Sequence, residues 1–217
     1  DLSNNQLNQT AQDNILLDLF DNWNTIKRGG VTVNLRGNTN NLGVNETKEA
    51  IDHAFNSQKK WALVTAKDRS EILKRFYDLM IENIDDLAMI LTAEMGKPLS
   101  EAKGEIIYGA SFIEWFSEEA KRIYGDLIPG HQVDKRISVI KQPIGVVASI
   151  TPWNFPNAMI ARKIGPALAV GCSFVCKPAD ETPLSALAMA LLAEKSGLPK
   201  GLFSVITSKK AALIGKE

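Results

Sequence analysis

Apolar side chains recur at helical spacing in three stretches between residues 45 and 123, before any strong strand pattern begins. The first stretch follows Asn45, which can N-cap a helix that carries Glu46 in its first turn. The second runs through residues 72–91 and stops at the helix-ending sequence Gly96-Lys97-Pro98. The third places six apolar side chains on one face of a predicted helix: Ile106, Ala110, Ile113, Phe116, Ala120 and Ile123.

The period of the pattern changes at Arg136, where apolar and polar side chains begin to alternate as far as Lys141. A turn at 142–145 follows, and Val146–Ile150 is then a largely apolar run, which is typical of a strand buried on both faces of a parallel sheet. From there we expect strands at 146–150, 173–177 and 202–206, separated by helices at 157–170 and 184–196. This alternation predicts an α/β fold with a doubly wound parallel sheet.

Three segments follow from these patterns. Residues 1–45 contain eleven asparagines and are poorly defined, with a short helix expected at 13–20 and a short strand at 30–34. Residues 46–145 form a helical region that ends in the first strands of a hairpin, and residues 146–217 form the start of a ligand-binding α/β domain. Ligands bind such sheets at the carboxyl ends of the strands, so the residues after Ile150 and Cys176 are the first candidates for a site.

Composition narrows the function classes. Lys plus Arg and Asp plus Glu are both 25, so the formal net charge is zero and no basic run attracts nucleic acid or an anionic membrane. No apolar stretch approaches the roughly 20 residues that span a bilayer, and the first residues do not resemble a signal peptide. Two cysteines make no disulfide framework, which favours a reducing, cytoplasmic setting, and no cluster of metal ligands is present.

The loop after the first sheet strand, Thr151 to Pro156, presents Trp153 and Asn154 between two prolines. An amide held in this way can stabilise an oxyanion in a transition state. The alternative is that Asn154 only caps the following helix and that Trp153 fills the core.

Lys177 and Asp180 follow the second strand and can together hold the ribose hydroxyls of a dinucleotide. A carboxylate there repels a 2′-phosphate, which favours NAD over NADP. The alternative is an exposed lysine and an aspartate that caps the next helix. No Gly-x-Gly-x-x-Gly follows the first strand, so the ordinary dinucleotide fingerprint is absent.

Several of these motifs occur together in one known family. The segments 150–156, Gly165-Pro166-Ala167-Leu168, Gly171-Cys172 and Lys177-Pro178-Ala179 resemble the aldehyde dehydrogenase superfamily in order and spacing. Residues 94–99 look like the helix-ending motif of that family. The stretches 110–119 and 124–145 are similar to succinate-semialdehyde dehydrogenases in particular.

The resemblance implies a mechanism in which a cysteine thiolate attacks the aldehyde, hydride passes to the nicotinamide, and water activated by a glutamate hydrolyses the thioester. By position, Asn154 matches the oxyanion-hole amide. Arg162 matches an arginine that holds the carboxylate of the substrate; the alternative is that Arg162 and Lys163 form a solvated or salt-bridged helix face. The remaining matches are to the cofactor cleft and its adenosine ribose: Ile150, Thr151, Pro152, Trp153, Lys177, Ala179 and Asp180.

The same resemblance implies that the catalytic cysteine, the general-base glutamate and a second glycine-bearing loop lie beyond the end of this chain, and Thr207-Ser208 departs from the glycine expected after the third strand. Cys172 and Cys176 are expected in the core rather than as nucleophiles. We therefore interpret the chain as an N-terminal part of an NAD(P)-dependent aldehyde dehydrogenase whose family reaction is the oxidation of succinate semialdehyde to succinate, and we expect the chain to be inactive alone. We expect its partners to be a small aldehyde substrate and either the missing C-terminal half or a full-length homologue. The alternative from another class is a non-enzymatic remnant of that family that binds cofactor or forms hetero-oligomers. A third interpretation, a related acyl-phosphate reductase, is disfavoured by Pro152-Trp153-Asn154.

Overall fold

The computed structural model describes residues 43–217, so the helix expected at 13–20 and the strand expected at 30–34 lie outside the described residues. Within residues 43–217, four long helices come first: α2 (Val44–Trp61), α3 (Ala66–Glu82), α4 (Ile84–Met95) and α5 (Leu99–Glu119). The pattern predicted three, but its second stretch is divided at Asn83, which ends α3 and precedes α4. The 3₁₀ turn η2 (Ala120–Arg122) follows α5. The remaining elements are β1 (Asp126–Pro129), β2 (Arg136–Val139), β3 (Val146–Ile150), α6 (Ala158–Ala169), β4 (Ser173–Lys177), α7 (Pro183–Lys195), β5 (Phe203–Val205) and α8 (Ala211–Ile214).

The start of α2 differs from the sequence prediction. Gly43, not Asn45, is the N-cap, and the Glu46 carboxylate accepts a hydrogen bond from the Gly43 N–H at 2.9 Å. Glu46 is thus the third helical residue and reaches back to the cap, which places Asn45 inside the helix. The predicted end of the second helical stretch is confirmed, because Gly96 adopts φ +81° and terminates α4.

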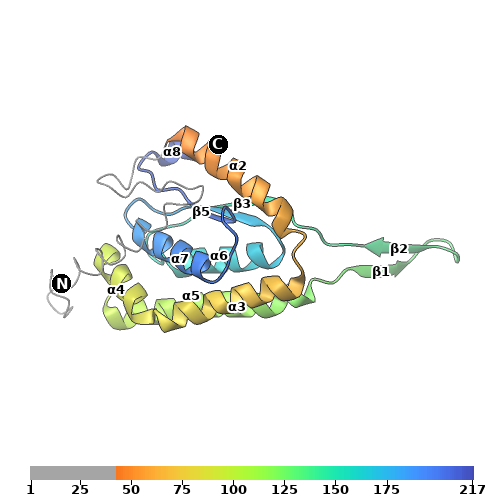
Figure 1. The fold of residues 1–217 in the computed structure, drawn as a ribbon, viewed down its shortest axis with the longest axis horizontal. Coiled ribbons are helices and arrows are strands. Elements are labelled where there is room, and N and C mark those ends of the chain that lie inside the picture. The colour runs from red at the N-terminus through yellow and green to blue at the C-terminus, as the bar shows by residue number, and fades with distance from the viewer. Residues whose placement is uncertain (1–42) are drawn as a thin grey trace.

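The molecule is layered around a small parallel sheet in the order β3-β4-β5 (Figure 1). Helix α2 lies on one face of this sheet, and α6 and α7 cover the other. Helices α3, α4 and α5 form an outer layer that packs on α6 and α7. The expected α/β architecture, with helices on both faces of a parallel sheet, is confirmed.

Burial differs between the two sheet strands that carry candidate residues. All five residues of β4 are buried, because β3 and β5 flank it and helices cover both of its faces. In β3, by contrast, Ala148 and Ile150 are exposed, so the expectation that this strand is buried on both faces is wrong. Within residues 43–217, β3 lies at the edge of the sheet and pairs only with β4.

The amino ends of α6 and α7 are both capped by glutamates from the outer helices. The Glu105 carboxylate of α5 accepts hydrogen bonds from the N–H groups of Asn157 and Ala158 at 3.0 and 3.2 Å. The Glu94 carboxylate of α4 accepts them from Leu184 and Ser185 at 2.8 and 3.0 Å. Each carboxylate satisfies free amides and complements the positive end of the helix dipole.

The carboxyl ends of the same two helices receive donors from the outer helices and from α2. Trp61 and Arg69 donate to the carbonyl oxygens of Leu168 and Ala169, both at 3.0 Å. Arg75 donates to the Ser196 carbonyl after α7 at 2.8 Å. The first four helices therefore hold α6 and α7 at both ends, which fixes the loops that lead into them.

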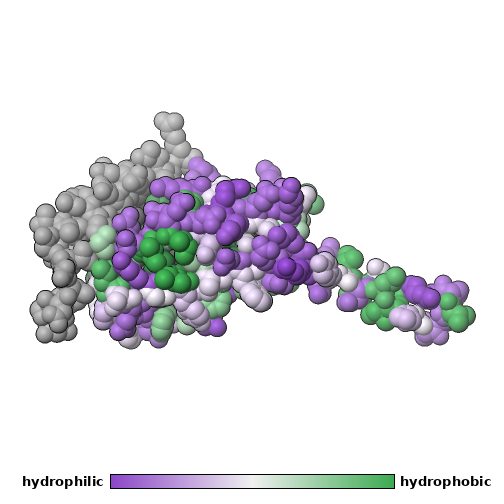
Figure 2. Space-filling view, turned by 90° about the horizontal axis from the view of Figure 1, so that it is seen from below, coloured by the Kyte–Doolittle hydropathy of each residue, from purple (hydrophilic) through white to green (hydrophobic). Residues whose placement is uncertain are grey.

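Strands β1 and β2 pair antiparallel and form an arm that extends away from the layered body (Figure 1). Every residue of the two strands is exposed, and apolar residues stand out along the arm in Figure 2. Leu127, Val133 and Ile140 are exposed by 72%, 99% and 72%. Among residues 43–217, no helix combines the length and the apolar character that crossing a membrane requires.

Candidate functional site

The two loops singled out from the sequence leave the sheet side by side. Ile150, the last residue of β3, is paired in register with Lys177, the last residue of β4. The Thr151 N–H continues the ladder by donating to the Lys177 carbonyl at 3.2 Å. The carboxyl edge of the sheet therefore brings the 151–154 loop and the 177–180 loop together, as the strand pattern predicts.

The side chains of the 151–154 loop are mostly exposed to solvent. Trp153 is 54% exposed, so it does not fill the core. Asn154 is also exposed, and it does not cap α6: Asn157 is the N-cap residue and the Glu105 carboxylate accepts the first amides. Both alternatives offered for this loop are thus wrong, which leaves the Asn154 side chain without a capping role.

The 177–180 loop also differs from the alternative interpretation, in which the lysine is exposed and the aspartate caps the next helix. Lys177 is 6% exposed rather than a surface lysine, and its ammonium group donates to the Pro178 carbonyl at 2.9 Å. Asp180 is partly exposed and does not cap α7, because Thr182 is the N-cap residue and Glu94 accepts the amides of Leu184 and Ser185. The Ala179 carbonyl accepts the Thr182 N–H at 3.3 Å and closes the turn between β4 and α7.

Arg162 lies exposed on α6, with its guanidinium carbon 5.4 Å from the centre of the Phe112 ring. Within residues 43–217 no carboxylate pairs with it, so a salt-bridged helix face is not found. Its neighbour Lys163 instead donates to the Ile150 carbonyl at 3.1 Å and ties α6 to the end of β3. Arg162 is therefore a solvent-exposed arginine that donates a hydrogen bond to Met159 Sδ at 3.8 Å, so the solvated helix face that the sequence offered as an alternative still stands.

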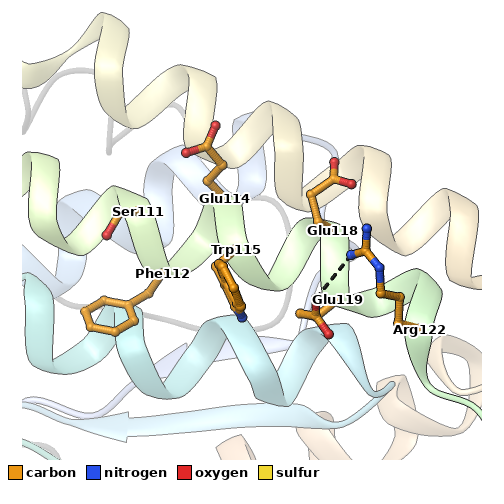
Figure 3. A pocket seen from close by; sticks show the side chains of 7 residues that line it. All are labelled: Ser111, Phe112, Glu114, Trp115, Glu118, Glu119 and Arg122. Atoms are coloured by element: carbon orange, nitrogen blue, oxygen red, sulfur yellow. Dashed lines mark hydrogen bonds and ion pairs between the residues drawn. The ribbon is translucent and has the colours of Figure 1, made fainter.

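Phe112 also borders a groove along α5, shown in Figure 3. In that view Phe112 and Trp115 point away from Glu114 and Glu118. The carboxylates of the groove already have cationic partners: Glu114 with Lys74 at 3.7 Å, Glu118 with Lys121 at 3.2 Å, and Glu119 with Arg122 at 3.1 Å. The groove thus adds no unpaired charge to the site.

The two cysteines of the chain lie in the core, as predicted. Cys172 is 1% exposed, and Cys176 is fully buried in the middle layer. Burial raises the pKa of the Cys176 thiol to about 12, so this thiol stays protonated near neutral pH. No group of three or more possible metal ligands occurs among the described residues.

Three residues near the site were missed by the sequence reasoning. Glu94 and Lys97 were considered only as parts of a helix-ending motif, and Glu105 was not considered. A signal for Glu105 did exist, because an acid stands beside Ile106 on a helix face that carries Ala102, Gly109 and Ala110, all of them buried. A carboxylate on such a face needs a buried partner, here the Lys97 ammonium and the start of α6.

Glu94 predicts a dependence of stability on pH. Burial raises its pKa to about 7, with a smaller contribution in the same direction from the Glu105 charge, against the opposing hydrogen bonds of the Leu184 and Ser185 amides. A carboxyl whose pKa is raised by folding stabilises the fold when protonated. This stabilisation is therefore complete below about pH 4.5 and is lost as pH rises through 7.

Relative to a Glu94→Gln variant, the free energy of unfolding of the wild-type chain should fall by roughly 3 kcal/mol between pH 4.5 and pH 8. The variant is the control because it keeps the shape and removes the titration. Urea unfolding of both proteins at a series of pH values measures the difference. A difference that stays constant with pH would contradict the expectation.

A model of the aldehyde dehydrogenase family matches residues 31–216. Over 197 residues the chain is 60% identical to a glutarate-semialdehyde dehydrogenase of Pseudomonas aeruginosa, covering 90% of this chain and 41% of the relative. It is also 60% identical to a succinate-semialdehyde dehydrogenase [NADP(+)] of Escherichia coli, covering 83% and 37%. The structure of a succinate-semialdehyde dehydrogenase from Burkholderia pseudomallei superposes with a TM-score of 0.78 at 60% identity, covering 80% and 36%. The chain thus spans about two fifths of the length of these relatives.

Proposed function

Because the chain belongs to the aldehyde dehydrogenase family, we propose that it supplies one part of the active site of an NAD(P)-dependent semialdehyde dehydrogenase: the dinucleotide edge, the oxyanion amide and an arginine for the substrate. The observation that carries this proposal is the meeting of the 151–154 and 177–180 loops at one edge of the sheet. Asn154 and Asp180 lie in those loops, and neither residue caps the helix that follows.

The residues at this edge fit a dinucleotide. The Lys177 ammonium is held at the end of β4 by the Pro178 carbonyl, and the partly exposed Asp180 follows three residues later, so this loop carries both a cation and a carboxylate that suit ribose hydroxyls and phosphate. The exposed Ile150, Pro152 and Trp153 offer an apolar wall against which aromatic rings can lie, with Thr151 at its base. The bound dinucleotide supplies the hydride acceptor for the oxidation.

Asn154 would donate its side-chain amide to the oxygen that becomes negatively charged when a nucleophile attacks the aldehyde carbon. Such a donor typically contributes about 3–4 kcal/mol to the transition state when its position is fixed beforehand. Asn154 lies on a short, proline-bounded loop, and Glu105 anchors the start of the helix that follows this loop.

Arg162 supports a substrate that ends in an anionic group. Its guanidinium is exposed on α6 and has no carboxylate partner among the described residues, so it can bind a carboxylate through two parallel hydrogen bonds. Two of the similar proteins carry names that specify the succinate or glutarate semialdehyde, both of which have a carboxylate at the far end from the aldehyde. We therefore propose a short dicarboxylic semialdehyde as the substrate.

The choice of dinucleotide requires a revision of our sequence-based preference. The carboxylate of Asp180 favoured NAD, whereas the similar Escherichia coli enzyme is named for NADP(+) at 60% identity. We propose NADP as the cofactor, with Asp180 limiting the affinity for its 2′-phosphate rather than preventing binding. Asp180 is only partly buried, so its charge is screened by water.

Replacing Asp180 by serine should increase the affinity for NADP relative to NAD by about tenfold, since about 1.4 kcal/mol of charge repulsion is removed. Calorimetric titration of the wild-type and D180S chains with both dinucleotides measures the ratio. Glu181→Gln is the control, because Glu181 is adjacent and exposed and the change removes the same charge. An unchanged ratio would contradict the role of Asp180, and the absence of binding by either dinucleotide to either protein would contradict the proposed function.

A further inference from the structure

The turn between α4 and α5 contacts the loop that carries Asn154. Lys97 lies in this turn, and its side chain is only 9% exposed. Its ammonium group forms an ion pair with Glu105 and also donates to the backbone carbonyl of Asn154 at 3.1 Å. The same ammonium lies 3.9 Å from the centre of the Phe155 ring. One side chain thus contacts two consecutive residues of the loop.

Glu105 completes the connection from the other side. Its side chain is 1% exposed, and its Oε2 atom faces Lys97 while its Oε1 atom accepts the N–H groups of Asn157 and Ala158. The residues 154–158 are therefore held by two outer side chains that are themselves paired. A buried, fully satisfied ion pair of this kind has one low-energy arrangement, so it fixes geometry more than it adds stability.

The packing behind the loop leaves little room for adjustment. A Cβ atom added to Gly109 would lie 2.3 Å from Asn157 Oδ1 and 3.3 Å from Ala158 Cα, so α5 and the start of α6 touch backbone to side chain. Asn157 itself is fully buried. On the side of the loop that α5 does not close, Lys97 contacts Asn154 and Phe155, and the Phe155 carbonyl also accepts the Met159 N–H at 3.0 Å.

We propose that Lys97 is a positioning residue for the Asn154 amide: through its bond to the Asn154 carbonyl, its contact with the Phe155 ring and its pairing with Glu105, it holds the loop in the orientation that aims the amide. This inference rests on the proposed role of Asn154. An oxyanion donor is effective only when it is held in place before the reaction, and a misplacement of about 1 Å costs much of its effect.

The test measures amide hydrogen exchange across the chain in the absence of any dinucleotide, which separates it from the binding tests of the proposed function. In Lys97→Met, exchange at Asn157 and Ala158 should accelerate by about tenfold or more while β4 keeps its protection. Lys97→Arg should restore most of the protection, because arginine can keep the ion pair and the ring contact. Lys103→Met is the matched control, since the side chain of Lys103 on α5 is 42% exposed and pairs with Asp85.

A purely structural role for Lys97 would raise exchange throughout α5, α6 and β4 together, without rescue by arginine, and that result would overturn the proposal. Unchanged exchange at Asn157 and Ala158 would overturn it as well. If Lys97→Met does not fold, Phe155→Leu removes the ring contact alone and should accelerate exchange at the Asn157 and Ala158 amides by about threefold, again without an effect on β4. No local acceleration in Phe155→Leu would then contradict the proposal.

Discussion

Replacing Glu105 by alanine is expected to lower the free energy of unfolding by about 3–5 kcal/mol, the largest effect of a single substitution that we expect in this chain. The change leaves the buried ammonium of Lys97 without its partner and removes the acceptor for two amides at the start of α6. It also opens space at a side chain that is 1% exposed, so water has limited access to the groups left behind.

Glu101→Ala is the matched control, because Glu101 lies one turn earlier on α5 and is exposed. It should change stability by less than about 1 kcal/mol, the usual size of a helix-dipole contribution. Urea unfolding followed by circular dichroism compares the two variants with the wild type. An equal loss of unfolding free energy in both variants would show that the contacts of Glu105 between α5 and α6 contribute no more than those of an exposed glutamate.

The second large effect concerns activity. The 217-residue chain alone is expected to show no oxidation of succinate or glutarate semialdehyde, because the motif resemblance implies a cysteine nucleophile and both thiols of the chain are buried in its core. Cys172 and Cys176 are both buried, and burial raises the pKa of Cys176 to about 12. A buried thiol is not accessible to an aldehyde, and that of Cys176 also stays protonated near neutral pH.

The absorbance of NADPH, recorded with purified chain, NADP and each semialdehyde, tests this expectation. A thiol reagent supplies an independent check: both cysteines should react only after denaturation. Turnover above the rate of a heat-denatured sample would contradict the expectation, and its loss in Cys172→Ser or Cys176→Ser would identify which thiol had been misjudged.

The sequence pattern predicted the parallel sheet closely because hydrophobic periodicity and turn residues are local. Strands at 146–150 and 173–177 occur as predicted, and the helix expected at 184–196 forms at Pro183–Lys195. The error at β3 has a topological cause. An apolar run shows that a segment can be buried on both faces, but it does not reveal whether strands lie on both of its sides.

The helix caps could not be predicted in the same way. Asn154 and Asp180 each stand just before a helix, where a short polar side chain usually caps it. The structure gives this task to Glu105 and Glu94, which are 52 and 90 residues away from the first amide that each accepts. A cap that comes from a distant helix leaves no signal in the residues next to the helix that it caps. Because Glu105 and Glu94 accept these amides, the side chains of Asn154 and Asp180 are not needed as caps.

Lys177 illustrates a further limit. A lysine at the end of a strand is expected to be exposed, and its burial here follows from β4 being the central strand and from the carbonyl of the next residue, Pro178, which accepts a hydrogen bond from the ammonium group. The match of Lys177, Arg162 and Asn154 to family positions came from the motifs around them. The contacts that these three side chains make could be seen only in the folded structure.

The most direct test of the cofactor site is a titration of the chain with NADP while tryptophan emission is recorded. A dinucleotide bound at the edge of the sheet would lie against Trp153, so the wild-type chain should show saturable quenching that is largely lost in Trp153→Phe. Trp115→Phe is the matched control, since Trp115 is similarly exposed but lies on α5, and it should retain the quenching. Absence of saturable quenching in the wild type, or equal quenching in Trp153→Phe, would contradict a dinucleotide site at the ends of β3 and β4.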